Sequence, residues 1–194
     1  MKLDLETINR LVSSVDTEDL QFRAVRSESS LLELVQTTEV VERAFEDYLM
    51  FQWIFEKITP DGLQRGIRLF VKLVQVVAIA SDGFILLAED RKTKRVVGAA
   101  QVAYENPSTW MIGRFFQKLR IYSAVLNAIL FDNLRIPVQV LSSWTTVKRA
   151  TTVIDVLEAE RLKKVGITTR HLYLMQLAAD PSVRGNGKIL NNLN

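Results

Sequence analysis

The stretch from residue 84 to residue 104 constrains the fold most, because the apolar pattern changes there from helical spacing to strand spacing. A short apolar run, Phe84 to Ala88, follows Asp82 and Gly83, and a polar turn at residues 90–94 separates it from a second apolar run, Val96 to Tyr104. Two such runs around a polar turn predict an antiparallel hairpin. The chain therefore contains a sheet, and the helical spacing before it predicts helices that pack on that sheet.

The residues before the hairpin are expected to form mostly helices. Residues 1–20 read as a helical extension, and Phe22 to Arg26 alternates like a first strand. Ser30 and Glu33 have capping-box spacing, and helical spacing then runs from Val40 towards Pro60. A further helix is predicted from Asp61, with its apolar and polar positions on separate faces. The apolar face holds Leu63, Ile67, Phe70, Val74 and Val77, and the polar face holds Arg65, Arg68, Lys72 and Gln75.

Two more helices and one strand are expected after the hairpin. Ser108 is a suitable cap for a helix that runs to about Phe131, and Ser142 or Ser143 caps another that ends near Lys163 to Gly166. The second of these helices should turn Val147, Ala150, Ile154 and Leu157 inward. Leu172 to Ala179 then reads as the last strand. We therefore expect one α/β (α+β) domain over residues 1–194, with a mixed, mostly antiparallel sheet flanked by helices and a helical insertion at 108–167.

Composition excludes several classes of site. The chain has no cysteine and a single histidine, His171, so it cannot build a disulfide scaffold, a thiolate zinc site, an iron–sulfur cluster or a multi-histidine metal centre. Its first residues carry acids where a secretory signal needs an apolar run, which favours the cytoplasm. The longest apolar stretch, Ile67 to Ala80, contains Arg68 and Lys72, so no membrane span is expected.

Charge is unevenly distributed along the chain. Acidic residues outnumber basic ones in residues 1–62, and the reverse holds in residues 63–194, with a net charge of +3 overall. A basic half suits an anionic partner, which could be a nucleic acid, a membrane surface or a phosphorylated cofactor, and it also fits solvated helix faces. No helix-turn-helix, zinc-finger or RNA-recognition pattern is present, so no specific nucleic acid is expected as a partner.

The segment after the last strand has the features of an anion site. Asp180 and Pro181 make a turn, and the following residues, Arg184 to Ile189, contain two glycines and two cations. Glycines let main-chain N–H groups approach a phosphate, and a helix start supplies unpaired donors. The spacing matches neither a Walker loop nor a dinucleotide fingerprint. An ordinary strand–turn–helix corner is the alternative interpretation.

This segment resembles motif A of the GCN5-related N-acetyltransferases (GNAT), whose signature is Arg or Gln, two residues, Gly, one residue, then Gly or Ala. Arg184 and Gly187 match it, and Ile189 stands where the family has a small residue. Weaker similarities occur in the same order along the chain. They are His171 to Leu174, Ala44 to Asp47, Trp53 to Phe55, and Val96 to Ala100.

The resemblance implies a GNAT-like fold and acetyl-CoA as co-substrate. The pantetheine arm would bind main-chain groups of Leu177, Ala178 and Ala179, and the pyrophosphate would bind Arg184, Gly185, Asn186, Gly187, Lys188 and Ile189. The implied reaction is transfer of an acetyl group to the amine of a small molecule or peptide. An alkyl amine is mostly protonated at neutral pH, so a proton acceptor is needed. Neither Glu105 nor His171 can be assigned that role from the sequence.

The family has further strands and helices after this loop, whereas only residues 191–194 follow Leu190 here. We therefore expect a C-terminally truncated GNAT-like domain whose last strand is an exposed edge. A second function then stays open. The chain could act as a non-catalytic interaction module, or as a degenerate homologue of the acetyltransferases, that pairs with another chain, including a second copy in a homodimer.

Overall fold

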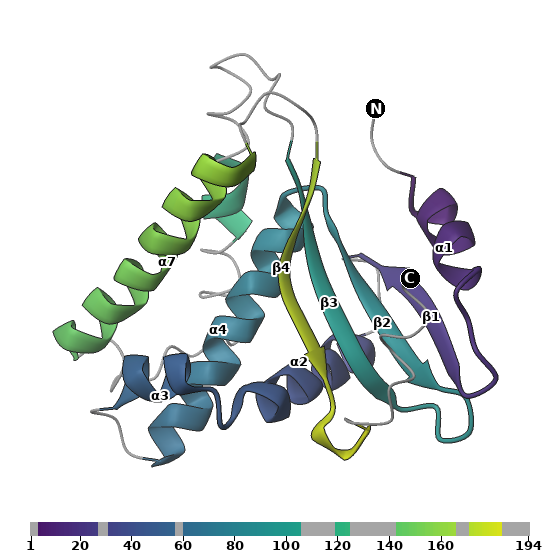
Figure 1. Ribbon diagram of the computed structural model, residues 1–194, viewed down its shortest axis with the longest axis horizontal. Helices are drawn as coiled ribbons and strands as arrows, with labels where there is room; N and C mark the ends of the chain where they lie inside the picture. Colours follow the sequence, from purple (N-terminus) through teal and green to yellow (C-terminus); the bar gives the residue numbers. More distant parts are fainter. Residues whose placement is uncertain are drawn as a thin grey trace.

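Four antiparallel strands form one open sheet, and helices flank it (Figure 1). The structure is a computed structural model that describes residues 4–26, 31–56, 60–105, 119–124, 143–165 and 171–183. The strands follow one another across the sheet in chain order, as β1 (Leu20–Val25), β2 (Phe84–Asp90), β3 (Val96–Glu105) and β4 (His171–Ala179). The expected α+β class and the predicted hairpin are both confirmed.

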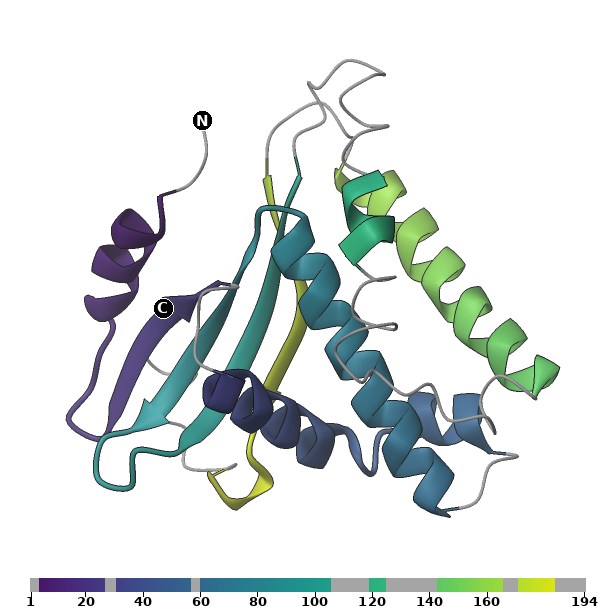
Figure 2. The ribbon, with the colours of Figure 1, turned by 180° about the vertical axis from the view of Figure 1, so that it is seen from behind.

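The helices divide between the two faces of this sheet. Helices α2 (Leu31–Phe45) and α4 (Pro60–Ala80) cross one face, as the view from behind shows (Figure 2). On the other face α1 packs against β1, where Ile8 contacts Ala24, Phe84 and Val102. The helices are α1 (Leu5–Ser13), α2 (Leu31–Phe45), α3 (Leu49–Phe55), α4 (Pro60–Ala80) and α7 (Trp144–Val165), with a helical segment at 119–124 and a single 3-10 turn, η1 (Pro181–Val183).

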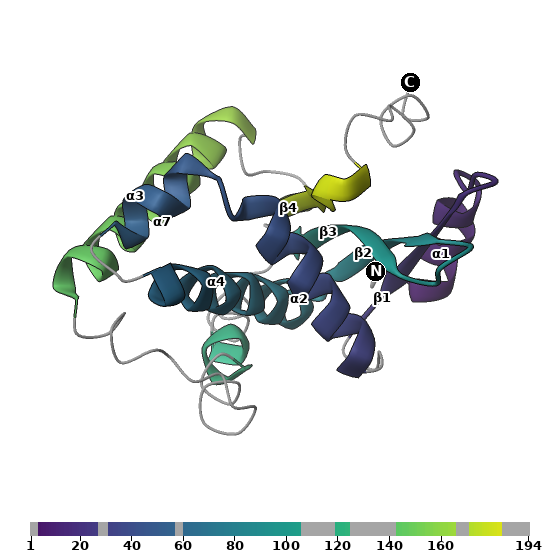
Figure 3. The ribbon, with the colours of Figure 1, turned by 90° about the horizontal axis from the view of Figure 1, so that it is seen from below.

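The main core lies between the sheet and the layer of α2 and α4. The sheet contributes the fully buried Ile85 and Leu87, and α4 contributes Ile67 and Val71. Helix α3 extends this core, because the ring of Phe51 packs edge-on against the ring of Phe70, with 5.1 Å between the ring centroids. Viewed from below, α3 lies beside α7 (Figure 3), and it also contacts α4. Burial of these apolar side chains is the main favourable term in the stability of the fold.

Two helix predictions need correction. The residues from Val40 to Phe55 do not form one helix. Helix α2 ends at Phe45 and α3 begins at Leu49, and Tyr48 between them has an extended backbone. The break re-aims the chain so that Phe51 can pack into the core. In α7 the residue expected inward, Leu157, is 53% exposed. Val153 packs on the core instead, because α7 contacts the rest of the molecule mainly through α3.

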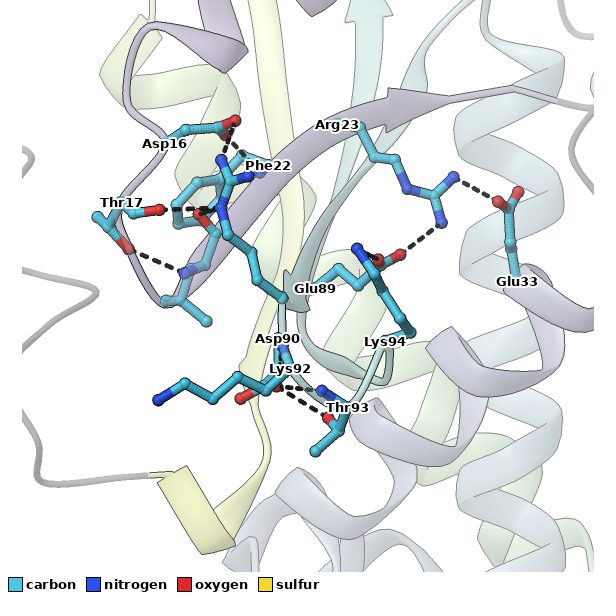
Figure 4. A network of polar contacts seen from close by, with 12 residues as sticks. Asp16, Thr17, Phe22, Arg23, Glu33, Glu89, Asp90, Lys92, Thr93 and Lys94 are labelled. Carbon is cyan, nitrogen blue, oxygen red and sulfur yellow. Dashed lines mark hydrogen bonds and ion pairs between the residues drawn. The ribbon is translucent and has the colours of Figure 1, made fainter.

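The turn of the β2–β3 hairpin is closed by one carboxylate (Figure 4). Asp90 Oδ1 accepts hydrogen bonds from the N–H groups of Thr93 and Lys92, at 2.7 and 2.9 Å, and from the Thr93 hydroxyl. The bonds from Thr93 hold the pKa of Asp90 below its usual range. Lys94 then takes a positive φ of 56°, which returns the chain into β3. Local side-chain bonds of this kind explain why residues 90–94 turn where the sequence predicts.

Gly83 lies in a close backbone contact between α4 and the sheet. A Cβ at this position would lie 1.9 Å from the carbonyl oxygen of Val102 and 2.7 Å from that of Ala78. Main-chain atoms cannot move aside as a flexible side chain can, so only glycine fits here. Within the described residues, no helix combines the length and the apolarity that crossing a membrane requires.

Replacing Gly83 with alanine should therefore destabilise the fold. We expect Gly83→Ala to lower the free energy of unfolding by at least about 3 kcal/mol, since the added methyl group overlaps two carbonyl oxygens. Gly98→Ala is the matched control, because its Cβ would meet only the Ala88 Cβ at 3.2 Å and the Ala178 oxygen at 3.5 Å. Urea denaturation measures both changes. Equal effects of the two substitutions would contradict the packing described here.

Candidate functional site

The carboxyl end of β4 is the part of the expected site that the structure describes. Leu177, Ala178 and Ala179 are the last three residues of this strand. The remaining expected cofactor residues, Arg184, Gly185, Asn186, Gly187, Lys188 and Ile189, lie outside the described residues. The structure thus fixes where the strand ends and how the chain leaves it.

The main chain of β4 alternates between pointing towards β3 and pointing away from it. Asp180 N–H donates to the carbonyl of Val97 at 2.8 Å, and Ala178 is the register partner of Ala99. In an antiparallel pair every second residue bonds to the neighbouring strand, so Ala178 faces β3 and Leu177 faces the open edge. Within the described ranges β4 is the last strand on this side of the sheet. The N–H and C=O of Leu177 are therefore directed to the position that a further extended segment would take.

Small residues let the two strands and the helical layer approach closely at this end. Gly98 pairs with Ala179, Ala99 with Ala178, and Ala100 with Leu177. Ala178 is buried against the core under α2 and α4, whereas Leu177 lies on the opposite face and is 60% exposed. Apart from Leu177, the residues paired at this end of β3 and β4 are glycine and alanine, which leave little side-chain bulk.

A turn centred on Asp180 fixes the direction of the chain after β4. One carboxylate oxygen accepts from the N–H and the hydroxyl of Ser182, at 3.0 and 2.7 Å. The other accepts from Nη2 of Arg43 on α2, at 2.7 Å. Val183 N–H bonds to the Asp180 carbonyl, and the Val183 side chain packs on Leu20, Ala88 and Val97. The chain therefore passes around the end of the sheet to the face opposite α2 and α4.

The Asp180 carboxylate is held in its charged form. Burial by itself raises its pKa, but the hydrogen bonds from Ser182 and the bond and charge of Arg43 together outweigh burial and hold the pKa below its usual range. Asp180 thus joins α2 to the end of β4 as an anion at neutral pH. The sequence predicts Asp180 in the turn, but it indicates no role for Arg43, because the two residues are far apart in the chain.

Strand β4 has a bulge in its middle. Gln176 pairs with Gln101 and Leu174 pairs with Val102, so Met175 is the extra residue on β4. A bulge leaves one residue out of the regular ladder and bends the strand, and bulges are over-represented next to active sites. The bulge keeps Leu172, Leu174 and Leu177 on one face, where they are 47%, 51% and 60% exposed. We call these three side chains the leucine stripe.

The residues considered for proton transfer stay unassigned. The side chains of Glu105 and His171, a register pair at the other end of β3 and β4, lie outside the described residues. Tyr173 is half-buried. Among the described residues no three carboxylate or imidazole side chains come together in a way that could hold a metal ion.

A second group of charged residues joins β1, β2 and α2, at the same end of the sheet as the carboxyl end of β4 (Figure 4). Arg23 on β1 bonds to Glu33 on α2 and, at 3.2 Å, to Glu89 on β2. Lys94 lies 3.8 Å from the same Glu89. Opposite charges are balanced in this cluster, so it serves to join the elements and offers little attraction for a charged ligand.

Comparisons with protein-family models, with curated proteins and with solved structures found no match to this chain.

The Asp180 turn yields a pH-dependent prediction. Asp180→Asn should lower the free energy of unfolding at neutral pH by about 1 kcal/mol, because a partly exposed ion pair with Arg43 is lost. An aspartate with a lowered native pKa stabilises fully above the unfolded pKa of about 3.9 and loses that contribution as pH falls through the native pKa. The difference between wild type and variant should therefore shrink in acid.

Urea denaturation of both proteins at neutral pH and in the acid range measures this difference. Asp155→Asn on the exposed side of α7 is the matched control and should change little at either pH. A difference between wild type and Asp180→Asn that stays constant in acid would contradict the charged state assigned to Asp180.

Proposed function

We propose that the chain binds acetyl-CoA at the carboxyl end of β4 and transfers its acetyl group to a primary amine. The observation that carries the proposal is the course of the chain there. An open strand edge, with the main chain of Leu177 directed outward, leads through the Asp180 turn directly into the segment with Arg184 and Lys188. The resemblance of that segment to motif A supplies the identity of the ligand.

The charge pattern of this end of the chain suits such a ligand. Residues 172–179 carry no charged side chain, and a neutral pantetheine arm would lie along this uncharged edge with its amides bonded to the main chain. Arg184 and Lys188 follow within nine residues of Ala179 and suit the diphosphate, because arginine can hold two phosphate oxygens at once. The single acid between Ala179 and Arg184, Asp180, is neutralised by Arg43. The uncharged strand β4 therefore suits the pantetheine arm, and the cationic segment that follows it suits the diphosphate.

The same edge could also assist the reaction. Attack of a neutral amine on a thioester places negative charge on the carbonyl oxygen, and a fixed main-chain N–H stabilises that charge. The bulge at Met175 interrupts the regular ladder of β4 near the middle of the strand, which makes its main-chain groups candidates for that role. The acetyl donor would then lie beside Met175 to Leu177, with the diphosphate beyond Asp180.

Binding can be tested by thermal stability. Coenzyme A at about 100 times its dissociation constant should add about 2.7 kcal/mol to the stability of the wild type. This corresponds to a rise of about 5 to 10 °C in the unfolding temperature. Arg184→Ala combined with Lys188→Ala should abolish most of the rise, since both cations are proposed to meet the diphosphate. Lys148→Ala, on the exposed side of α7, is the control and should keep it.

Failure of coenzyme A to raise the unfolding temperature of the wild type would contradict the proposal. An equal rise in the wild type and the Arg184 and Lys188 variant would show binding elsewhere on the molecule. If binding is seen, consumption of acetyl-CoA in the presence of a panel of primary amines tests the transfer step and the class of acceptor.

The leucine stripe favours a second candidate, an interaction module that pairs with another copy of the chain. Three exposed leucines beside an uncharged strand edge form a surface that soluble proteins usually cover. If this is the function, light scattering should give a concentration-dependent dimer. Replacing Leu172, Leu174 and Leu177 with serine should return it to a monomer. A wild type that stays monomeric at high concentration would exclude this candidate.

A further inference from the structure

Three glutamines hold the buried polar side-chain atoms that lack a hydrogen-bond partner in the described part of the chain. These atoms are Nε2 of Gln75, both Oε1 and Nε2 of Gln101, and Oε1 of Gln176. Gln101 has no exposed surface, and Gln75 and Gln176 are 6% and 8% exposed. A buried amide without a partner destabilises a fold by about 1 to 3 kcal/mol, so each such group in a native protein requires an explanation.

The three side chains come from neighbouring elements at one level of the core. Gln101 and Gln176 are direct partners across β3 and β4. They share a face with Ala99 and Ala178, which pack in one cluster with Val71 of α4. Directly opposite residues in an antiparallel pair have Cβ atoms about 5 Å apart, within reach of two amide side chains.

Gln75 belongs to the same level. It lies one turn after Val71 on the buried side of α4 and three residues before Ala78. The Ala78 carbonyl accepts from Gly83 N–H, and a Cβ on Gly83 would meet the main chain of Ala103. Helix α4 therefore runs along β3, with Ala78 near Ala103 and with Val71 in the same core cluster as Ala99. Gln75 falls between these points, level with Gln101.

The unpartnered atoms match one another in chemistry. Two are donors, on Gln75 and Gln101, and two are acceptors, on Gln101 and Gln176. We propose that these side chains form a buried amide relay by rotation of their torsions, in which Gln75 donates to Gln101 and Gln101 donates to Gln176. The Oε1 of Gln75 already accepts from the Thr38 hydroxyl at 3.3 Å, which extends the relay to α2. Each of the four unpartnered amide atoms then has a hydrogen-bond partner.

The relay acts as a device that holds the register of β4. In the present register Gln176 is buried and Leu177 is exposed, the reverse of what burial of apolar surface favours. A slip by one residue would move Leu177 into the core and Gln176 into solvent, because successive side chains alternate between faces. Bonds from Gln101 to Gln176 oppose that slip. They keep the bulge at Met175 in place and the leucine stripe on the outer face.

Substitution of Gln101, the middle residue of the relay, tests the proposal, because the relay predicts that the unfolding temperature falls. Gln101→Met keeps the size and removes both amide atoms. If the relay forms, Gln75 and Gln176 lose their partners and the unfolding temperature falls by about 3 to 8 °C. If Gln101 has no partner, its replacement by an apolar side chain leaves the temperature unchanged or raises it, and that result overturns the proposal. Gln52→Met, at an exposed position of α3, is the matched control.

A second substitution distinguishes a relay from a general packing defect. Gln176→Met should lower the unfolding temperature of the wild type but raise that of Gln101→Met, because in the variant it removes an unpaired acceptor. Additive losses would contradict the relay. If Gln101→Met does not fold, hydrogen exchange of the glutamine side-chain amides in the wild type decides. Slow exchange of the Gln75 and Gln101 amides supports the relay, and rapid exchange of either overturns it.

Discussion

The pairing of β4 with β3 determines which side chains of the last strand are buried and which are exposed, and the candidate site depends on it. The register places Ala178 and Gln176 under the helical layer and turns Leu177 outward. Apolar burial alone would favour the opposite arrangement. Specific contacts must therefore hold β4. Asp180 anchors the end of the strand to Val97 and Arg43, and the proposed amide relay would join Gln176 to Gln101 near the bulge.

These contacts connect local chemistry to the arrangement of the site. Arg43 belongs to α2, so the ion pair with Asp180 ties the helical layer to the point where β4 ends. Val183 packs on the other face of the sheet, so the chain turns around the sheet end immediately afterwards. The strand edge is uncharged, and the cations come after the turn. A ligand with a neutral arm and an anionic end fits that order of features.

Much of the fold follows from local patterns in the sequence. The hairpin was predictable because Asp90 closes its turn with bonds to its own neighbours, and α7 begins where expected because Ser143 accepts from Thr146 N–H at 3.3 Å. The last strand, predicted from Leu172 to Ala179, is confirmed as His171–Ala179. Such features depend on residues close together in the chain, which sequence reasoning can assess.

Features that depend on distant residues were not predictable. Gln75 was assigned to the polar face of its helix but is buried, because α4 turns the stripe of Ile67, Val71 and Gln75 towards the sheet. The break before Tyr48 follows from packing of Phe51 among rings of other elements, and Arg43 meets Asp180 only in the folded chain. Of the expected cofactor residues, Leu177, Ala178 and Ala179 lie at the carboxyl end of β4. The role of Arg184 to Ile189 in binding the diphosphate stays a prediction.

Titration of the isotope-labelled chain with coenzyme A, followed by NMR of the main-chain amides, tests the central proposal most directly. If coenzyme A binds at the carboxyl end of β4, the shifts change along one continuous path, from Met175 and Leu177 through Asp180 to Arg184 and Lys188, while amides of α1 and of the β2–β3 turn stay constant. Unchanged shifts along that path, or changes confined to another part of the molecule, would contradict the assignment of the carboxyl end of β4 as the binding site.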